Sequence, residues 1–540
     1  MNTTESATPA LNRARRRPLA RSGSALGGAG ILVAGSAAAL LTAFAGSAGA
    51  TSTITVDSNG DGTVDPTHCL DGTPYNCTLR DAALAAVDGD TITFDPSIAN
   101  ITLTNGTITT QAVNITGPGA ANLTITTTAA AGAYDLFRVG GTGDAVISGL
   151  TITKNRVKAL NGGAFTLDSV TISGSSGGDG GALYAGNSGE LEIKNSRFEN
   201  NTASNNAGAV YIYNGQDTTI SNSVFVNNEA ASVGGAISGS YAKNLTIMDS
   251  EVTGNSSGDR GGGLRFYSGG AYTVHISGST FDSNVSAAYG GAADFGDDLS
   301  VVVSNTTVSN NSANGGAGLN FDGNNIDATV NNSTIAGNTA ANGGAGIYIN
   351  SGSTLTVNQS TISANVAEGT TPNYSGGGIS IGDNTSVVTM SGTIVSGNTS
   401  GVAGAGDIGL YTSDLNATGS FTATHSLIGE VDTRIHENDP LFVAPVSSNL
   451  HRPDPMLSAL ADNGGPTKTM SPQPGSPAID RGPNPVATFT GNSFDQRGTG
   501  YDRISGKSAD IGAFEVQSEP PATTTTVAGT DEPVAPAFTG

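Results

Sequence analysis

The chain has 540 residues, among them 77 glycines and no tryptophan, and its formal net charge is −23. This acidic balance argues against a nucleic-acid-binding protein, which presents a basic surface, and against docking on anionic lipid. Only two cysteines are present, Cys69 and Cys77, and in an exported chain two cysteines this close are expected to form one disulfide.

Residues 1–50 are predicted to be an export signal. Five arginines occur from Arg13 onward, an apolar stretch follows near Ile31–Ala45, and Ala48-Gly49-Ala50 has the small-residue pattern of a cleavage site. The pair Arg16-Arg17 keeps twin-arginine export open beside the ordinary secretory route. We therefore expect a protein that is secreted or at the cell surface, with no membrane span in the mature chain.

A loop with calcium-like spacing follows. Asp57, Asn59, Asp61 and Asp65 have the spacing of the first half of a calcium-binding loop, but the twelfth position, where such a loop places glutamate, holds His68. The two interpretations are a weak calcium site and an ordinary turn-rich loop. No other cofactor is expected.

Residues 51–95 are predicted to form an N-terminal cap that includes a short helix. Thr78 and Asp81 can form a capping box at the start of an apolar helical face over Leu79–Ala86. The run Cys77–Ala82 resembles the CSLREA motif of a bacterial surface-protein domain, with threonine and aspartate in place of serine and glutamate. The resemblance implies a helix that precedes a right-handed β-helix, and a cap would protect the open end of such a solenoid.

The stretch from Ser196 to Asn398 repeats eight times. Each repeat has a hydroxyl residue, an apolar residue two places later and an asparagine three places after that, and a glycine-rich step recurs with nearly the same period. The intervals between the asparagines are 27, 27, 29, 27, 27, 27 and 33 residues. The repeated asparagines are Asn201, Asn228, Asn255, Asn284, Asn311, Asn338, Asn365 and Asn398.

This period predicts a parallel β-helix. Apolar and polar residues alternate around each asparagine, as in short strands, and about three such runs fit one period. Coils of three strands stacked about 4.8 Å apart form long parallel sheets, whereas a β-propeller blade needs about 40–50 residues. We therefore predict an all-β fold in which residues 96–438 form a right-handed, single-stranded parallel β-helix of about 27 residues per coil.

The asparagines have a mechanical role in such a fold. Asparagine tolerates the left-handed backbone of a sharp turn, and stacked side-chain amides can form a ladder. A buried amide without partners costs about 1–3 kcal/mol. We expect Asn311→Ala, in the middle of the ladder, to cost this much, and more than Asn398→Ala at its frayed edge.

Residues 439–515 differ in character because proline becomes frequent. Five blocks are distinctive: Asp454-Pro455-Met456-Leu457, Asp462-Asn463-Gly464-Gly465-Pro466-Thr467, Gly475-Ser476-Pro477-Ala478-Ile479-Asp480, Asp495-Gln496-Arg497-Gly498 and Asp510-Ile511-Gly512-Ala513-Phe514-Glu515. Together they resemble the bacterial choice-of-anchor Q domain, which implies a surface protein without defined catalysis. We expect this domain to cap the C-terminal end of the solenoid, and the Pro/Thr-rich tail 516–540 to be disordered.

The sequence indicates no catalytic residue. The carboxylates of the array include Glu190, Glu192, Asp282, Asp294, Asp297 and Asp298. The tightest pair is Asp297-Asp298, with Arg265 about one coil earlier, and we interpret all of them as solvated turn residues. The five histidines do not have metal-ligand spacing.

Several tyrosines are expected to point outward from the coils. Counting inward and outward positions after each glycine step selects Tyr184, Tyr211, Tyr213, Tyr267 and Tyr348. Aromatic rings gathered on one face can stack on sugars or contact a partner. The alternative is ordinary exposed tyrosine on a sheet.

The leading hypothesis is an exported, non-enzymatic β-helix protein of the cell surface with an adhesin or envelope role. It would be a monomer that meets an unidentified glycan or protein. The alternatives are a polysaccharide lyase or glycosidase on the same scaffold, and a glycan-binding module. The enzyme hypothesis requires carboxylates and a cation within about 10 Å of each other in one groove.

Overall fold

The computed structural model describes residues 51–517 apart from residues 63–64, 71–73, 75, 187–188, 371–375, 404, 411–419, 432–447 and 452–453. The predicted export signal, and the predicted disordered tail from residue 518 onward, lie outside the described residues. In the described part of the chain, no helix has the length and apolar character needed to cross a membrane.

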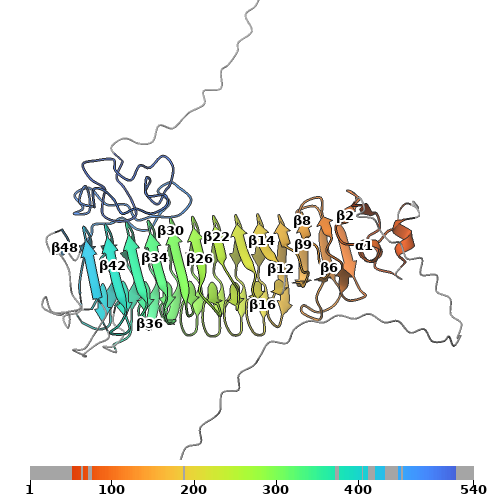
Figure 1. Cartoon of the computed structure of the whole chain (residues 1–540), viewed down its shortest axis with the longest axis horizontal. Coiled ribbons are helices and arrows are strands. Elements are labelled where there is room, and N and C mark those ends of the chain that lie inside the picture. Colours follow the sequence, from red (N-terminus) through yellow and green to blue (C-terminus); the bar gives the residue numbers. More distant parts are fainter. Residues whose placement is uncertain are drawn as a thin grey trace, which may run out of the picture. The chain divides into compact units, whose positions relative to one another are not determined.

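Parallel strands stacked in register build the fold, as the repeat predicts. The pairings between the named strands are all parallel, and they form a 14-stranded sheet, a 12-stranded sheet and a third sheet of two adjoining ladders. Along the stack the strands follow one another from β2, beside α1, to β48 (Figure 1).

The three sheets have the following strands. The 14-stranded sheet consists of β1 (Thr53–Val56), β2 (Thr91–Phe94), β5 (Asn114–Thr116), β8 (Ala145–Ser148), β11 (Phe165–Asp168), β14 (Glu190–Lys194), β18 (Asp217–Ser221), β22 (Leu245–Met248), β26 (Tyr272–Ser277), β30 (Leu299–Ser304), β34 (Asp327–Asn331), β38 (Thr354–Asn358), β42 (Val387–Ser391) and β46 (Ser420–Thr424). The 12-stranded sheet consists of β4 (Ile108–Thr110), β7 (Phe137–Val139), β10 (Val157–Ala159), β13 (Leu183–Gly186), β17 (Val210–Tyr213), β21 (Ile237–Ser240), β25 (Leu264–Tyr267), β29 (Ala293–Phe295), β33 (Leu319–Phe321), β37 (Ile347–Ile349), β41 (Ile379–Ile381) and β45 (Ile408–Leu410). The first ladder of the third sheet consists of β3 (Asn100–Leu103), β6 (Thr124–Thr127), β9 (Thr151–Asn155), β12 (Thr171–Gly177), β15 (Arg197–Glu199), β19 (Val224–Val226), β23 (Glu251–Thr253), β27 (Thr280–Asp282), β31 (Thr307–Ser309), β35 (Thr334–Ala336), β39 (Thr361–Ser363), β43 (Ile394–Val395), β47 (Leu427–Ile428) and β48 (Leu450–His451). Its second ladder starts at β12 and continues through β16 (Thr202–Ala203), β20 (Glu229–Ala230), β24 (Ser256–Ser257), β28 (Val285–Ser286), β32 (Ser312–Gly315), β36 (Thr339–Gly343), β40 (Val366–Ala367) and β44 (Thr399–Ser400).

Alternating burial along the strands places apolar side chains inside the coils. In β14, for example, Leu191 and Ile193 are buried and their neighbours are not. Leu191 pairs with Thr218 of the next coil, so one coil there takes 27 residues. The inward side chains form one continuous hydrophobic core, in which the rings of Phe198 and Phe225 stack 4.8 Å apart. Burial of each such ring contributes about 1.5–3 kcal/mol to folding.

The predicted asparagine ladder is present, and its amides are paired on both sides. Asn311 Nδ2 donates to Asn338 Oδ1 at 2.9 Å and to the carbonyl of Phe281 at 3.0 Å. Its Oδ1 accepts from the backbone N and from Nδ2 of Asn284, both at 2.9 Å. The same side-chain bond joins each neighbouring pair from Asn201 to Asn398, so the ladder is continuous.

The left-handed turn residue lies one position earlier than expected. φ is 54° at Asn200, 53° at Asn227 and 54° at Asn310, and each of these residues directly precedes a ladder asparagine. The eight ladder asparagines, all of which the structure describes, do not have positive φ. Our expectation for them is therefore wrong. Because the preceding residue makes the turn, the ladder amide is free to point into the coil.

A carboxylate closes the C-terminal end of the ladder. Asp407 Oδ1 accepts from the backbone N and from Nδ2 of Asn398, both at 2.8 Å, and Oδ2 accepts from the backbone N of Glu430 at 2.7 Å. Burial raises the pKa of Asp407 in spite of these donors. Asn398 is 6% exposed and makes four bonds, as Asn311 does. The expectation that the ladder is frayed at Asn398 is therefore wrong.

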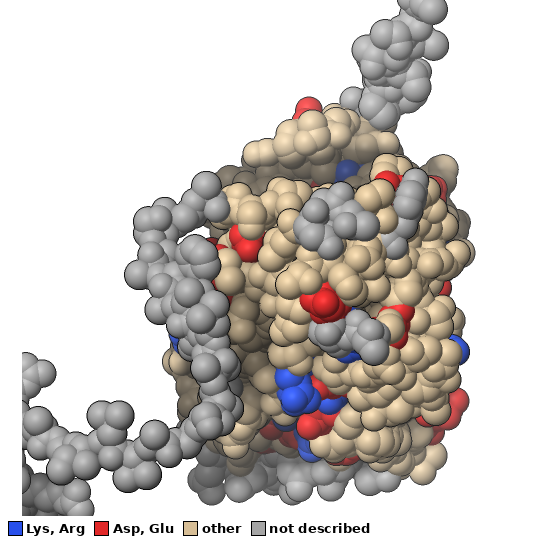
Figure 2. Space-filling view, turned by 90° about the vertical axis from the view of Figure 1, so that its right-hand side faces the viewer, with Lys and Arg blue, Asp and Glu red and all other residues tan. Residues whose placement is uncertain are grey.

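The N-terminal helix begins with the predicted capping box. The side chain of Thr78 accepts from the backbone N of Asp81, and the Asp81 carboxylate accepts from the backbone of Thr78, at the start of α1 (Leu79–Ala85). The predicted disulfide is confirmed, and it joins the end of the 3-10 helix η1 (Pro66–Cys69) to Cys77 just before α1. Figure 2 shows this end of the stack, where basic side chains lie together with acidic ones in one cluster and further acidic side chains are scattered over a largely uncharged face.

The C-terminal segment (residues 454–517) lies against the side of the stack, not over its end (Figure 1). Thr334 Oγ1 donates to Gln496 Oε1 at 2.6 Å, and Gln496 Nε2 donates to Thr307 Oγ1 at 2.9 Å. The backbone N of Ala513 donates to Thr361 Oγ1 at 3.0 Å. Threonine thus recurs at one position of β31, β35 and β39, and this column of hydroxyl groups binds the C-terminal segment. We had expected the segment to cap the C-terminal coil, and this expectation is wrong.

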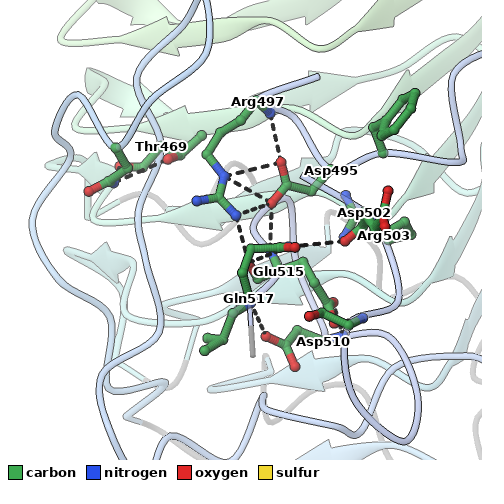
Figure 3. Close-up of polar contacts among 12 residues, drawn as sticks. Thr469, Asp495, Arg497, Asp502, Arg503, Asp510, Glu515 and Gln517 are labelled. Carbon is green, nitrogen blue, oxygen red and sulfur yellow. Dashed lines mark hydrogen bonds and ion pairs between the residues drawn. The ribbon is translucent and has the colours of Figure 1, made fainter. Parts of the chain in front are cut away.

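A buried charge cluster holds the C-terminal segment together (Figure 3). Arg497 binds the Asp495 carboxylate at 2.6 Å, and its guanidinium carbon lies 3.9 Å and 3.6 Å from the ring centroids of Tyr501 and Phe514. Burial, and next the charge of Asp510, raise the pKa of Glu515 to about 8. The protonated form of Glu515 is therefore favoured over a wider pH range than in a free glutamate.

Candidate functional site

The outward side chains of the 12-stranded sheet bring together groups that lie far apart in the sequence. In a parallel sheet in register, the same position of each strand forms a column along the stack. None of the ten residues of one such column, all described, belongs to the hydrophobic core. From β7 to β41 they are Arg138, Lys158, Tyr184, Tyr211, Ser238, Arg265, Asp294, Asn320, Tyr348 and Ser380.

Five tyrosines form a continuous group on this face, which we call the tyrosine strip: Tyr184, Tyr211, Tyr213, Tyr241 and Tyr267. Their successive ring centroids lie 5.6, 6.0, 6.5 and 5.8 Å apart. Tyr241 is 57% exposed, whereas Tyr211 is almost covered by its neighbours. Rings at these separations contact one another, so the strip presents a joined aromatic surface.

Cations flank the tyrosine strip at both ends. Lys158 Nζ lies 4.8 Å from the ring centroid of Tyr184, and the guanidinium of Arg156 lies 5.9 Å from it. At the other end the guanidinium of Arg265 lies 5.9 Å from the centroid of Tyr267. The chain as a whole carries a net charge of −23. The basic groups at both ends of this aromatic surface therefore stand out against the acidic composition of the chain.

An ionic cluster of Arg260, Arg265, Asp294 and Asp322 follows the C-terminal end of the strip. Arg265 Nε lies 3.0 Å from Asp294 Oδ2. Arg260 Nη1 lies 3.7 Å from Asp294 and 3.4 Å from Asp322, and its guanidinium also covers the ring of Tyr289 at 4.7 Å. Burial raises the pKa of Asp294, although the charges of Arg265 and Arg260 oppose this.

The ionic cluster corrects one interpretation of the sequence, because Asp294 is 0% exposed and is not a solvated turn carboxylate. Asp297 and Asp298 are turn residues, as expected, and they accept hydrogen bonds from the side chains of two turn asparagines, Asn324 and Asn325. Two carboxylates, Asp294 and Asp322, converge on Arg260, which meets the distance that the enzyme hypothesis requires, but Asp294 is buried.

Buried polar atoms without hydrogen-bond partners recur along the same column. They are Ser238 Oγ, Asn320 Oδ1 and Ser380 Oγ. A buried polar atom that is left unpaired costs about 1–3 kcal/mol. Other unpaired buried atoms lie elsewhere in the described part of the chain, for example on Thr218 and Gln359, so they do not by themselves distinguish this face.

The tyrosines selected from the sequence divide between two places. Tyr184, Tyr211, Tyr213 and Tyr267 belong to the tyrosine strip, whereas Tyr348 is 5% exposed and lies three coils beyond Tyr267. Its side chain packs against Gly344 and Gly382, where an added Cβ would lie 2.9 Å and 2.2 Å from its atoms.

Of the four calcium candidates, Asp57, Asn59, Asp61 and Asp65, the three aspartates have partners within the chain. Asp61 pairs with Arg80 at 2.6 Å, and Asp57 Oδ1 accepts from the backbone N of Cys77 at 2.8 Å. Asp65 caps η1. Among the described residues there is no group of three or more His, Cys, Asp and Glu side chains that could hold a metal ion.

Three residues of this face were not selected from the sequence: Tyr241, Arg260 and Asp322. Tyr241 has a φ of 54° in the turn after β21, so alternation along the strand cannot place it. Arg260 and Asp322 meet although 62 residues separate them. The glycine-rich steps are the signal that could have identified them, because aligning the coils at these steps places Arg260 and Asp322 on neighbouring parts of one face.

Comparison with solved structures finds similarity at low sequence identity over most of the chain. The A-modules of the Azotobacter vinelandii mannuronan C-5 epimerases AlgE6 and AlgE4 are 13% and 14% identical to the chain; they cover 73% and 67% of it, with 97% and 93% of their own lengths and TM-scores of 0.33 and 0.35. Pectate lyase Pel9A is 15% identical over 86% of this chain and 97% of its own, with a TM-score of 0.32. No curated protein matches the chain.

One family matches most of the coil array. The family described as a right handed beta helix region matches residues 27–281 and 137–326, which together span more than half of the chain. The stacked parallel coils have the architecture that this description names. The chain therefore belongs to the right-handed β-helix family.

Proposed function

We propose that the chain binds an acidic polysaccharide along the outer face of the 12-stranded sheet. The tyrosine strip between two groups of cations is the observation that carries this proposal. Aromatic rings offer a flat apolar surface with a polar edge, which suits a sugar ring, and arginine and lysine form charge-assisted hydrogen bonds with carboxylate or sulfate groups. The rings run along the stack from β13 to β25, so a linear ligand would lie parallel to the long axis of the solenoid.

An exported protein at the cell surface would use such a face to hold a matrix or envelope polysaccharide. An adhesin or envelope role would then follow from binding alone. The export signal predicted for residues 1–50 supports this location, and the acidic net charge would disfavour nonspecific attachment to acidic polymers away from the strip.

The ionic cluster supports a second candidate function, a polysaccharide-active enzyme. Arg260 Nη1 lies within 4 Å of two carboxylates, Asp294 and Asp322, at 3.7 and 3.4 Å. Paired carboxylates about 5–10 Å apart perform acid–base chemistry in glycosidases. Asp322 is 23% exposed and open to a ligand, whereas Asp294 is covered, so the buried member would act through Arg260 and not on the substrate itself.

Binding to defined polymers tests the proposal. The full-length chain would be titrated calorimetrically with polygalacturonate, alginate and neutral dextran. Tyr241→Ala and Tyr267→Ala should each weaken binding of an acidic polymer by about 1–2 kcal/mol, or roughly 5–30-fold. Tyr241→Phe, which keeps the ring, should bind nearly as well as the parent chain.

The matched control is Val285→Ala, because Val285 is also a large exposed side chain, at 48%, but lies on β28 of the third sheet. It should leave binding unchanged. Equal affinity of the two tyrosine variants and the parent chain would refute the proposed face. Release of new chain ends from the polymer, abolished by Arg260→Gln, would establish the enzymatic candidate.

A further inference from the structure

A small cavity lies where the tyrosine strip reaches the N-terminal coils. Its volume is about 260 Å³, and its lining includes Tyr134, Asp135, Arg138, Arg156 and Gly177. Sites for drug-sized ligands occupy about 300–1,000 Å³. The cavity is therefore suited to a single small group and not to a length of polymer.

One buried carboxylate orients both arginines of the cavity. Arg138 Nη2 donates to Asp135 Oδ2 at 2.9 Å, and Arg156 Nε donates to Asp135 Oδ1 at 2.7 Å. Burial alone would raise the pKa of Asp135, but the bonds from Arg138 and Arg156 outweigh it and hold the pKa low. Asp135 is thus ionised, and because it is only 6% exposed it serves the two guanidinium groups and not solvent.

Positive charge remains after this pairing. The Arg138 side chain is 50% exposed, and its bond to Asp135 uses one of the five donors of a guanidinium. Lys158 adds a third cation beside Tyr184. Asp179 is the nearby second carboxylate, and its Oδ1 accepts hydrogen bonds from Asn205 and Asn206. Three cations therefore face two carboxylates that already have partners.

The cavity also adjoins the first ring of the tyrosine strip. Arg156 lines the cavity, and its guanidinium lies 5.9 Å from the ring centroid of Tyr184. A sugar on Tyr184 would hold its acidic substituent within reach of these donors.

We infer that this cavity is a subsite for one acidic group, a carboxylate or a sulfate, of the polysaccharide. Arg138 supplies the free donors, Arg156 is held in place by Asp135, and Tyr184 carries the sugar ring to which the group belongs. This inference rests on the proposed function, which it deepens by naming where a charge of the ligand is bound. If the ion pairs of Asp135 had only a structural role, the cavity would bind acidic and neutral sugars equally well.

A matched pair of ligands tests the subsite. Galacturonate oligosaccharides and the same oligosaccharides with reduced carboxyl groups would be titrated into the full-length chain. Arg138→Gln should weaken binding of the acidic series roughly tenfold or more and leave the reduced series unchanged. Arg138→Lys, which keeps the charge but not the fork of donors, should recover part of the loss.

Arg197→Gln is the control variant, because Arg197 is likewise half exposed, at 47%, and pairs with a neighbouring carboxylate, Glu199, but lies on β15 of the third sheet. It should bind both series as the parent chain does. Equal weakening of both series by Arg138→Gln, or no weakening, would overturn the subsite. The proposed function would still stand if Tyr241→Ala weakens binding, so the two failures are distinguishable.

Discussion

The asparagine ladder allows a quantitative prediction at Asn311. Replacing Asn311 with alanine removes four hydrogen bonds, two that its Nδ2 donates and two that its Oδ1 accepts. Both of the latter come from Asn284, whose backbone N and Nδ2 would lose this acceptor inside a coil where Asn284 is 0% exposed. Each buried donor left unpaired costs about 1–3 kcal/mol. We therefore expect a loss of about 2–6 kcal/mol, more than a single hydrogen bond contributes.

The same calculation reverses the order expected from the sequence. Asn398→Ala removes the acceptor of the backbone N and of Nδ2 of Asn365, although this Nδ2 also donates to the carbonyls of Ile335 and Ser363. It also removes one of the donors to Asp407, which is a buried carboxylate. Asp407 keeps the backbone N of Asn398 and of Glu430 as donors, but hydrogen bonds to charged groups contribute more than bonds between neutral groups, so Asn398→Ala should destabilise the fold at least as much as Asn311→Ala.

Chemical denaturation followed by far-UV circular dichroism measures both losses, since the chain has no tryptophan to report by fluorescence. Because long repeat arrays can unfold in parts, hydrogen exchange of the Asn284 amide, which donates to Asn311 Oδ1, should be followed as a local measure. Asn324→Ala is the control, because Asn324 is an exposed asparagine whose side chain binds Asp297. Its effect should be below about 1 kcal/mol.

The result that would refute this reasoning is equality among the three variants. If Asn311→Ala and Asn398→Ala cost no more than Asn324→Ala, then water or a relaxed neighbour pairs the freed donors, and the ladder does not stabilise the fold. An accelerated exchange of the Asn284 amide without any global loss would restrict the effect to one coil.

Three further predictions follow from named contacts. The pKa of Glu515 is about 8 in the folded state and its ordinary value is 4.5, so the unfolding free energy should fall as pH rises between these values. Glu515→Gln should make this slope shallower in melting curves, while the buried carboxyls Asp294, Asp407 and Asp510, whose pKa values burial also raises, keep their own contribution. An unchanged slope would contradict the assignment. Cys69→Ser with Cys77→Ser opens a loop with a sequence separation of 8 and should cost about 2–3 kcal/mol, measured by urea denaturation against the parent chain. Lys158 and Arg265 are four strand spacings apart in one column, about 19 Å, so acidic oligosaccharides long enough to span them should bind more tightly than shorter ones, and calorimetry showing no dependence on length would exclude binding at both ends of the strip.

The coil array could be predicted because its signal is local and repeated. Each coil has the same few residue types at the same positions, so the asparagines and the glycine-rich steps reveal the period of the repeat directly. The capping box at Thr78 and Asp81 and the disulfide are likewise short-range features. Such features depend on neighbours that the sequence itself places side by side.

The candidate site was harder because it depends on register between coils of unequal length. The step from Leu245 to Val274 in the 14-stranded sheet takes 29 residues, so a fixed count of 27 does not align Arg265 with Asp294, its actual neighbour in the next strand. The C-terminal segment has no repeat at all. That it binds the threonine column of β31, β35 and β39 depends on surface complementarity, which periodicity does not encode.

The hydrogen bonds of the ladder all run the same way, since each asparagine donates its Nδ2 toward the C-terminal end and accepts from the coil before it. Every interior coil therefore offers the same donor on one side and the same acceptor on the other. If a coil were duplicated or deleted, the asparagines on both sides of the junction would still find matching partners. The length of the solenoid could therefore vary in evolution by whole coils of about 4.8 Å each. Asp407 fixes where this growth stops, because a carboxylate accepts from Asn398 but has no amide hydrogen to pass on.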